Sequence, residues 1–143
     1  MMPDNELTDI LRSARTIAIV GLSDDPNRPS YAVARFLQQK GYQILPVNPK
    51  LPGPVLGVQP YASLRDIVEH VDIVDVFRRA EFIPEIVEDA IVIQTNTVWM
   101  QLSVVHEEAA LQARRAGINV IMDRCIAIEH RRLSRYAEMD LVS

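Results

Sequence analysis

A short apolar run that ends at a glycine constrains this chain most strongly. The run Thr16–Val20 leads into Gly21-Leu22-Ser23, a polar loop and then a segment of helical period that we expect Ser30 to cap. A strand, a glycine turn and a helix N-terminus together form an anion site, because the first backbone N–H groups of the helix point at the ligand. The sequence therefore predicts a phosphate-binding unit near its start.

The loop inside this unit departs from the usual dinucleotide fingerprint. It consists of Asp24-Asp25-Pro26-Asn27-Arg28-Pro29. Prolines and one arginine stand where a dinucleotide-binding loop has its later glycines. Arg28 can donate a charge-assisted hydrogen bond to a phosphate, although a solvated loop arginine is also compatible with the sequence. We therefore expect a phosphate site that differs from the ordinary NAD site.

Beyond this unit, apolar runs rich in Val and Ile alternate with segments of helical period. This alternation is typical of a Rossmann-like α/β fold, in which a doubly wound, mostly parallel sheet has helices on both faces. The expected strands are 16–22, 43–47, 72–77, 97–101 and 119–122. The expected helices are 5–12, one from Ser30 to Gly41, a short one capped by Ser63, 84–93, 105–116 and 126–139. The 143 residues predict a single domain, with a core over 14–125 and a charged C-terminal helix over 126–139.

Charge and cysteine content exclude several classes of protein. A net charge of -4 argues against a general nucleic-acid binder, because it provides no overall positive field for a phosphate backbone. The first eleven residues contain neither a secretory signal nor a membrane-spanning run, and Cys125 is the single cysteine, so we expect a cytoplasmic protein that does not act at a membrane. We expect His70, His106 and His130 on the surface, with no metal site.

Ligands of an open parallel sheet bind beyond the carboxyl ends of its strands, near the point where the strand order reverses. Polar residues follow the expected strand ends at five places. These are Gly21-Leu22-Ser23, Val47-Asn48-Pro49-Lys50, Phe77-Arg78-Arg79, Trp99-Met100-Gln101 and Asp123-Arg124-Cys125. They are the candidate binding residues of the chain.

The second of these places discriminates best between ligands. NAD-binding domains carry an Asp or Glu there to hold the ribose hydroxyls, whereas this chain has Asn48, Pro49 and Lys50. An amide followed by a lysine suits an extra phosphate on the ribose, as in NADP or in the 3′-phosphate of coenzyme A. A simple Asn-Pro turn is the alternative interpretation.

The remaining places are more ambiguous. Phe77 followed by Arg78 and Arg79 suits an adenine face and a diphosphate, or else a core aromatic followed by two solvated arginines. We expect Trp99 in the core, and Gln101 can be a buried amide. Asp123 and Arg124 can form an ion pair beside the Cys125 thiol, whereas nothing in the sequence identifies a partner for Asp75, which lies within an apolar strand.

Taken together, these motifs resemble the small stand-alone CoA-binding proteins. That family is similar to the CoA-binding domain of the succinyl-CoA synthetase alpha subunit and of the NDP-forming acyl-CoA synthetases. The resemblance extends from about residue 14 to residue 125. It rests on Gly21-Leu22-Ser23, Arg28-Pro29-Ser30-Tyr31, Gly41-Tyr42, Pro46-Val47-Asn48-Pro49, Ser63-Leu64, the run from Asp72 to Arg78, Val98-Trp99-Met100-Gln101 and Met122-Asp123-Arg124-Cys125.

The resemblance implies coenzyme A across the strand ends. The diphosphate would lie near the backbone of Gly21, Leu22 and Ser23 and near the helix start at Arg28, Pro29, Ser30 and Tyr31. Val47, Asn48, Pro49 and Lys50 would lie near the ribose phosphate or adenine, and Phe77, Arg78 and Arg79 near the nucleotide. Trp99 and Gln101 would line the wall. One departure is Ser103, where the family usually has a glycine, and binding would be weaker if that glycine needs a positive φ.

The resemblance also implies binding without catalysis. The synthetases place a phosphorylated histidine and a nucleotide-grasp domain outside this module, and the sequence contains neither. We therefore expect a non-catalytic module for coenzyme A or an acyl-CoA, with any protein partner left open. A small NADP-linked oxidoreductase and a nucleotide-sensing domain, like that of redox-sensing repressors, are the alternatives. We also expect Cys125 to face the same crevice and to form a mixed disulfide with coenzyme A.

Overall fold

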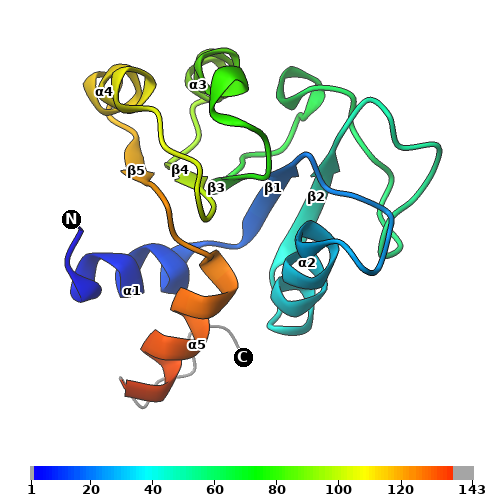
Figure 1. The fold of residues 1–143 in the computed structure, drawn as a ribbon, viewed down its shortest axis with the longest axis horizontal. Helices are drawn as coiled ribbons and strands as arrows, with labels where there is room; N and C mark the ends of the chain where they lie inside the picture. The colour runs from blue at the N-terminus through cyan, green and yellow to red at the C-terminus, as the bar shows by residue number, and fades with distance from the viewer. Residues whose placement is uncertain (1, 137–143) are drawn as a thin grey trace.

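A five-stranded parallel sheet forms the centre of the computed structural model, which describes residues 2–136 (Figure 1). Its strands are β1 (Thr16–Val20), β2 (Gln43–Val47), β3 (Ile73–Val76), β4 (Thr97–Met100) and β5 (Asn119–Ile121). They lie in the order β2-β1-β3-β4-β5. The chain leaves β1 for β2 on one side and then crosses to β3 on the other, so the strand order reverses at β1. The predicted doubly wound α/β fold is confirmed.

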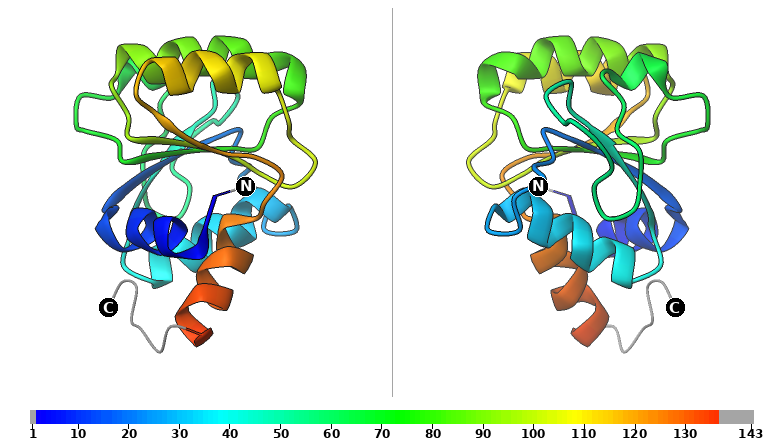
Figure 2. Two further views of the ribbon diagram at one scale, coloured as in Figure 1. Left: turned by 90° about the vertical axis from the view of Figure 1, so that its left-hand side faces the viewer. Right: turned by 90° about the vertical axis from the view of Figure 1, so that its right-hand side faces the viewer.

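Helices cover both faces of the sheet (Figure 2). The face shown below the sheet carries α1 (Asp4–Ser13), α2 (Pro29–Gln39) and α5 (Ile126–Tyr136), and the opposite face carries α3 (Ile83–Val92) and α4 (Glu107–Arg115). Two 3₁₀ turns, η1 (Leu64–Asp66) and η2 (Ala80–Phe82), precede α3. The C-terminal helix was expected to extend to residue 139, but residues 137–139 lie outside the described residues.

The strands are buried on both faces, which explains their continuous apolar sequences. In β1, Ile17 and Ile19 pack toward α1, α2 and α5, while Ala18 and Val20 pack toward α3 and α4. Trp99 of β4 is fully buried in the layer toward α1, α2 and α5, which confirms its expected place in the core. The fold thus has two apolar layers on either side of one sheet.

The start of α2 differs from the prediction. Arg28, rather than Ser30, is the N-cap residue, and Pro29 is the first helical residue. Proline suits this position because its fixed φ matches the helix and its missing N–H would have no intrahelical partner. The Ser30 hydroxyl instead accepts a hydrogen bond from the Ser23 backbone N–H at 3.0 Å. Ser30 therefore fastens the loop to the helix rather than capping it.

Two histidines have structural roles that the sequence did not indicate. His106 is the N-cap of α4, which begins at Glu107 instead of 105, and its Nδ1 accepts a hydrogen bond from the Ala109 N–H at 3.0 Å. His130 was expected on the surface, and this was wrong: it is 2% exposed, with its ring edge-on to those of Phe36 and Tyr42. The inward face of α5 includes position 130, because buried Ile126 lies one turn before it.

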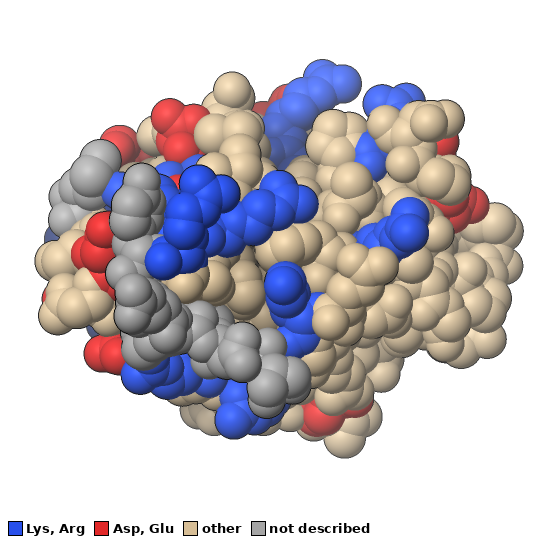
Figure 3. All heavy atoms as spheres, turned by 90° about the horizontal axis from the view of Figure 1, so that it is seen from below, with Lys and Arg blue, Asp and Glu red and all other residues tan. Residues whose placement is uncertain are grey.

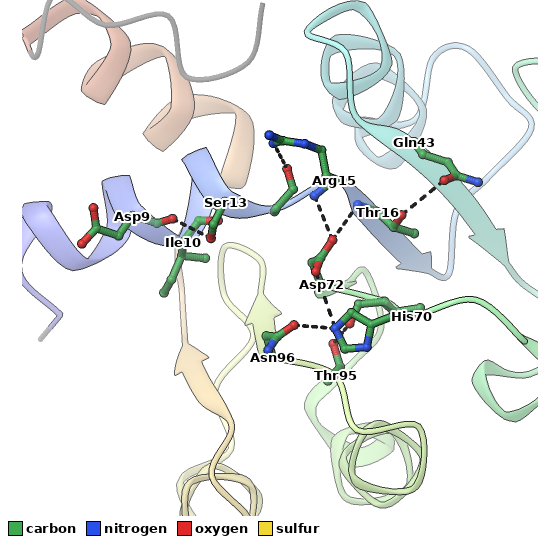
Figure 4. Close-up of polar contacts among 12 residues, drawn as sticks. Asp9, Ile10, Ser13, Arg15, Thr16, Gln43, His70, Asp72, Thr95 and Asn96 are labelled. Atoms are coloured by element: carbon green, nitrogen blue, oxygen red, sulfur yellow. Dashed lines mark hydrogen bonds and ion pairs between the residues drawn. The ribbon is translucent and has the colours of Figure 1, made fainter.

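A polar cluster closes the amino edge of the sheet, opposite the expected ligand site (Figure 4). One carboxylate oxygen of Asp72 accepts the backbone N–H groups of Arg15 and Thr16 at 2.8 and 2.9 Å. The other oxygen lies 3.5 Å from His70 Nε2, which is 2.6 Å from Asn96 Oδ1. The cluster joins the starts of β1, β3 and β4, so we assign these residues to the fold.

Candidate functional site

The carboxyl ends of β1, β2 and β3 are held together at the point where the strand order reverses. The Gly21 N–H donates to the Val47 carbonyl at 2.9 Å, and the Phe77 N–H donates to the Val20 carbonyl at 2.8 Å. Asn48 Nδ2 reaches across to the carbonyl of Leu22 at 3.1 Å. Three of the five places named from the sequence therefore meet at one site.

Gly21 allows the closest backbone approach at this junction. Its φ is +85°, and a Cβ at this position would lie 2.4 Å from the Phe77 carbonyl oxygen and 3.0 Å from Arg78 Cδ. Real side chains do not tolerate such a contact with backbone, and only glycine adopts this φ at no steric cost. The turn after β1 therefore lies directly against the turn after β3, which brings the two loops to one place.

The N-terminus of α2 opens beside this junction. No side chain caps it, and the Tyr31 N–H is used in a 3.1 Å bond to the carbonyl of Arg28. The Arg28 side chain is exposed next to the first turn. A helix start of this kind favours an anion through its dipole and its backbone N–H groups.

A hollow of about 230 Å³ lies beside these strand ends. Its lining comes from β1, β2, the loop before η1, the loop after β3, η2 and α3. The residues are Val20, Val47, Pro49, Ala62, Ser63, Leu64, Arg78, Phe82, Glu85, Ile86 and Asp89. The Arg78 guanidinium lies 4.0 Å from the centre of the Phe82 ring, a cation–π contact that holds a positive charge at the hollow. The lining thus combines apolar side chains with one guanidinium and two carboxylates.

Of the candidate residues, Val47, Pro49 and Arg78 line the hollow, and the rest of its wall was not predicted. The loop before η1 lies at the hollow because Tyr61 pairs with the end of β2. The Asn48 N–H donates to the Tyr61 carbonyl, and the Tyr61 N–H donates to the Pro46 carbonyl, both at 2.9 Å. Glu85 and Asp89 contribute carboxylates, and Arg65 neutralises Asp89 at 2.6 Å. These contacts join segments that are distant in the sequence, so no local sequence pattern predicts this part of the wall.

Asn48 acts within the protein, whereas Lys50 remains exposed. Besides its bond to Leu22, the Asn48 side chain accepts the Lys50 backbone N–H at 3.0 Å, which forms the turn that was the alternative interpretation of this stretch. Arg79 is also exposed and lies 3.7 Å from Glu81. Lys50 and Arg79 are therefore cations near the site whose side chains are open to a ligand.

A family model decides the identity of the chain. The model is described as a CoA binding domain, and it matches residues 15–131. The chain belongs to this CoA-binding domain family. The match begins one residue before β1, so α1 precedes it, and it ends within α5.

Relatives agree with this assignment over nearly the whole chain. The uncharacterized protein YneT of Bacillus subtilis is 42% identical over 125 residues, which are 87% of this chain and 92% of that protein. The structure of cell-free ID.343 from Thermus thermophilus is 41% identical with a TM-score of 0.89, covering 92% of this chain and 99% of that one.

A dinucleotide-forming acetyl-coenzyme A synthetase of Ca. Korarchaeum cryptofilum shares the fold. It is 21% identical with a TM-score of 0.68, and the match covers 79% of this chain but only 27% of that one. The expected family is thus confirmed by the family model, and the similarity to this synthetase is one of fold.

The fourth and fifth strand ends of this CoA-binding domain are tied to each other. Trp99 Nε1 donates to the Arg124 carbonyl at 2.9 Å, and the buried Gln101 Oε1 accepts the Ile126 N–H at 3.1 Å. Arg124 pairs with Glu129 at 2.9 Å, so the ion pair expected between Asp123 and Arg124 was wrong. Trp99 and Gln101 thus support this side from within.

Ser103 and Cys125 lie at the same end of the sheet. Ser103 has a φ of +68°, and its N–H donates to Asp123 Oδ1 at 2.7 Å. This left-handed conformation is one that glycine adopts freely, and the serine adopts it at a steric cost. Cys125 is half-buried, with its sulfur in the free thiol form.

Proposed function

We propose that this chain binds coenzyme A or an acyl-CoA across the carboxyl ends of β1, β2 and β3 and catalyses no reaction on it. Family membership supports the ligand class. The observation that carries the placement is the hollow at the strand ends, because its apolar walls carry the Arg78 guanidinium, and Arg78 lies against Gly21, whose loop leads into the uncapped start of α2. Adenine and a diphosphate together need such a combination.

The placement of the ligand follows from the charges. The diphosphate would lie at the turn after β1 and at the N-terminus of α2, where Arg28 is exposed. Lys50 would contact the 3′-phosphate, and the adenine would enter the hollow against Phe82. Trp99 and Gln101 are buried and do not line the hollow, so they would only support the neighbouring strand ends from within. This placement keeps all the proposed phosphate contacts on one rim.

The positions of the histidines support a binding role without catalysis. His70 lies at the amino edge, His106 caps α4 and His130 is buried beneath α2. None of them lines the hollow. Among residues 2–136, no helix is both long and apolar enough to span a bilayer, and no cluster of three or more acidic, histidine or cysteine residues is arranged for a metal ion. We place the proposed binding in the cytoplasm.

Titration calorimetry of the nucleotide-free protein with four ligands tests this function. Coenzyme A is expected to bind, 3′-dephospho-CoA to bind about tenfold more weakly, and NADP and NAD to bind more weakly still, because a charge-assisted contact contributes on that scale. In Lys50→Ala the difference between coenzyme A and its dephosphorylated form should shrink, most clearly at low salt. Arg115→Ala, on α4, is the matched control. Tighter binding of NADP than of coenzyme A would instead support the oxidoreductase alternative.

Cys125 gives a separate test of where the thiol end of the ligand lies. We expect the protein to exchange with oxidised coenzyme A: the Cys125 thiolate attacks the disulfide, forms a mixed disulfide and releases one coenzyme A thiol. Intact-mass spectrometry should show one added coenzyme A, removed by a reductant and absent in Cys125→Ser. An unchanged mass in a protein that binds coenzyme A would place the thiol end elsewhere.

A further inference from the structure

Two cations from different helices lie over one aromatic ring on the face formed by α2 and α5. Lys40, the C-cap of α2, has its Nζ 5.6 Å from the centre of the Phe36 ring, and Arg131 of α5 has its Cζ 4.4 Å from the same centre. Arg135 is exposed one turn after Arg131, and Ile128 is 50% exposed one turn before it. We call these five residues the α2–α5 basic face. Figure 3 shows lysine and arginine side chains gathered on this side of the molecule.

The cations of the α2–α5 basic face are not neutralised within the described part of the chain. Neither Lys40, Arg131 nor Arg135 forms an ion pair with a carboxylate of residues 2–136. The neighbouring Arg132 differs, because it bonds to both Asp4 and Glu129. The one acidic residue of α5 is therefore already occupied, and a concentration of positive charge remains on a protein whose net charge is -4.

The positive field of this face extends into the protein. His130 lies beneath it, with Ser134 and the rings of Phe36 and Tyr42 around its imidazole. Burial, together with the charges of Lys40 and Arg131, lowers the pKa of His130 to about 4. The histidine is thus neutral at neutral pH and adds no charge to this face.

We propose that the α2–α5 basic face docks an acidic peptide segment of a partner protein, with carboxylates on Lys40, Arg131 and Arg135 and one apolar side chain on Phe36 and Ile128. A short segment fits better than a nucleic acid or an anionic membrane, because the chain as a whole has a net charge of -4 and a long polyanion would also meet acidic residues elsewhere on it. On the opposite layer, α3 carries Glu85, Glu88 and Asp89 and no cation. A long polyanion would meet that repulsion, whereas a short segment would not.

This docking surface is separate from the proposed coenzyme A site. Lys40 lies at the C-terminal end of α2, and the ligand would lie at the N-terminal end, about 16 Å away for an 11-residue helix. A partner on this face would therefore leave the strand ends open. Loss of peptide binding and loss of coenzyme A binding can be measured independently in one protein.

Fluorescence anisotropy with a dye-labelled Glu-Glu-Leu-Glu-Glu peptide tests the proposal on the full chain at low salt. The double variant Lys40→Glu with Arg131→Glu should weaken peptide binding by about tenfold or more, since attraction becomes repulsion at two contacts. Arg114→Glu with Arg115→Glu makes the same charge change on α4 and should retain binding. Both variants should bind coenzyme A like the parent protein, and thermal melts should confirm that they are folded.

Three outcomes would overturn the proposal. Peptide binding that is absent, or is equally weakened by the α4 control, would mean that the α2–α5 basic face does not select acidic segments. Tighter binding of a single-stranded RNA pentamer or of vesicles containing phosphatidylserine would assign the face to another partner class. Binding that is gained only by the full-length Glu138→Gln with Asp140→Asn variant would identify the acidic end of the chain as the occupant.

Discussion

Gly21→Ala is expected to destabilise the protein by about 3 kcal/mol or more and to abolish ligand binding. The added Cβ would lie 2.4 Å from the Phe77 carbonyl oxygen, so the turns after β1 and β3 would have to separate. That separation would also break the junction at which the three strand ends meet. Urea unfolding followed by circular dichroism measures the loss of stability, and calorimetry with coenzyme A measures the loss of binding.

Gly117→Ala separates the cost of backbone conformation from that of the close contact. Gly117 also has a φ of +85°, but a Cβ there would have no neighbour within 4 Å. Its replacement should cost only about 1 kcal/mol, the strain of a left-handed alanine. Equal losses in the two variants would show that contact between the loops does not determine the need for glycine at position 21.

Asp75→Val is expected to stabilise the protein by about 2 kcal/mol or more at neutral pH. Asp75 is fully buried in β3 between Ile19 and Trp99, and neither of its carboxylate oxygens has a hydrogen-bond partner among residues 2–136. Burying an unpaired polar group is costly, and valine suits a central strand at a similar volume. Urea unfolding of the variant and the parent protein measures the difference.

The same aspartate predicts a pH dependence of stability. Burial raises the pKa of Asp75 well above its ordinary value. The folded chain therefore holds a proton that the unfolded chain releases above about pH 4, so the free energy of unfolding falls as pH rises toward the folded pKa, by at most about 1.4 kcal/mol per unit. Unfolding curves from pH 4 to 8 should show this decline in the free energy of unfolding. In Asp75→Asn, the part of the decline that comes from Asp75 should be absent.

Asp75→Asn is also the control for the role of charge, since it keeps the shape and the polarity of the side chain. It should be less stabilising than Asp75→Val, because an amide without partners remains buried. If both variants were less stable than the parent at every pH, the carboxylate would have stabilising partners in the protein in solution. Coenzyme A titrations of both variants would show whether those partners belong to the ligand site.

The secondary structure could be predicted closely from the sequence because parallel strands are buried on both faces. The expected β2 matches the observed Gln43–Val47, and the expected strand 97–101 is one residue longer than β4. Local signals failed at helix starts, where Ser30 was taken for a cap and Arg28 is the N-cap. The sequence Pro29-Ser30 is compatible with Ser30 as the N-cap and with Ser30 inside the first turn. The hydrogen bond from the Ser23 N–H to Ser30 belongs to the second arrangement, and it depends on the path of the loop.

The residues of the candidate site also fall into two groups: those that local sequence signals indicated and those that depend on contacts between separate segments. Val47, Pro49 and Arg78, which were named from the sequence, line the hollow because they lie at or just after strand ends, which a parallel sheet brings to one edge. Phe82 and the segment containing Ser63 were missed, because the pairing of Tyr61 with β2 and the stacking of Arg78 on Phe82 are contacts between separate segments.

The sequence by itself determined the α/β fold, the family to which the chain belongs and the edge of the sheet at which we place the candidate site. These features follow from the spacing of apolar residues and from short motifs, which are local. Only the tertiary structure decided that Gly21 has no room for a side chain, that His130 is buried under Lys40 and Arg131, and that the carboxylate of Asp75 has no described partner. Each of these depends on which surfaces meet when separate elements pack, and a linear pattern does not specify that.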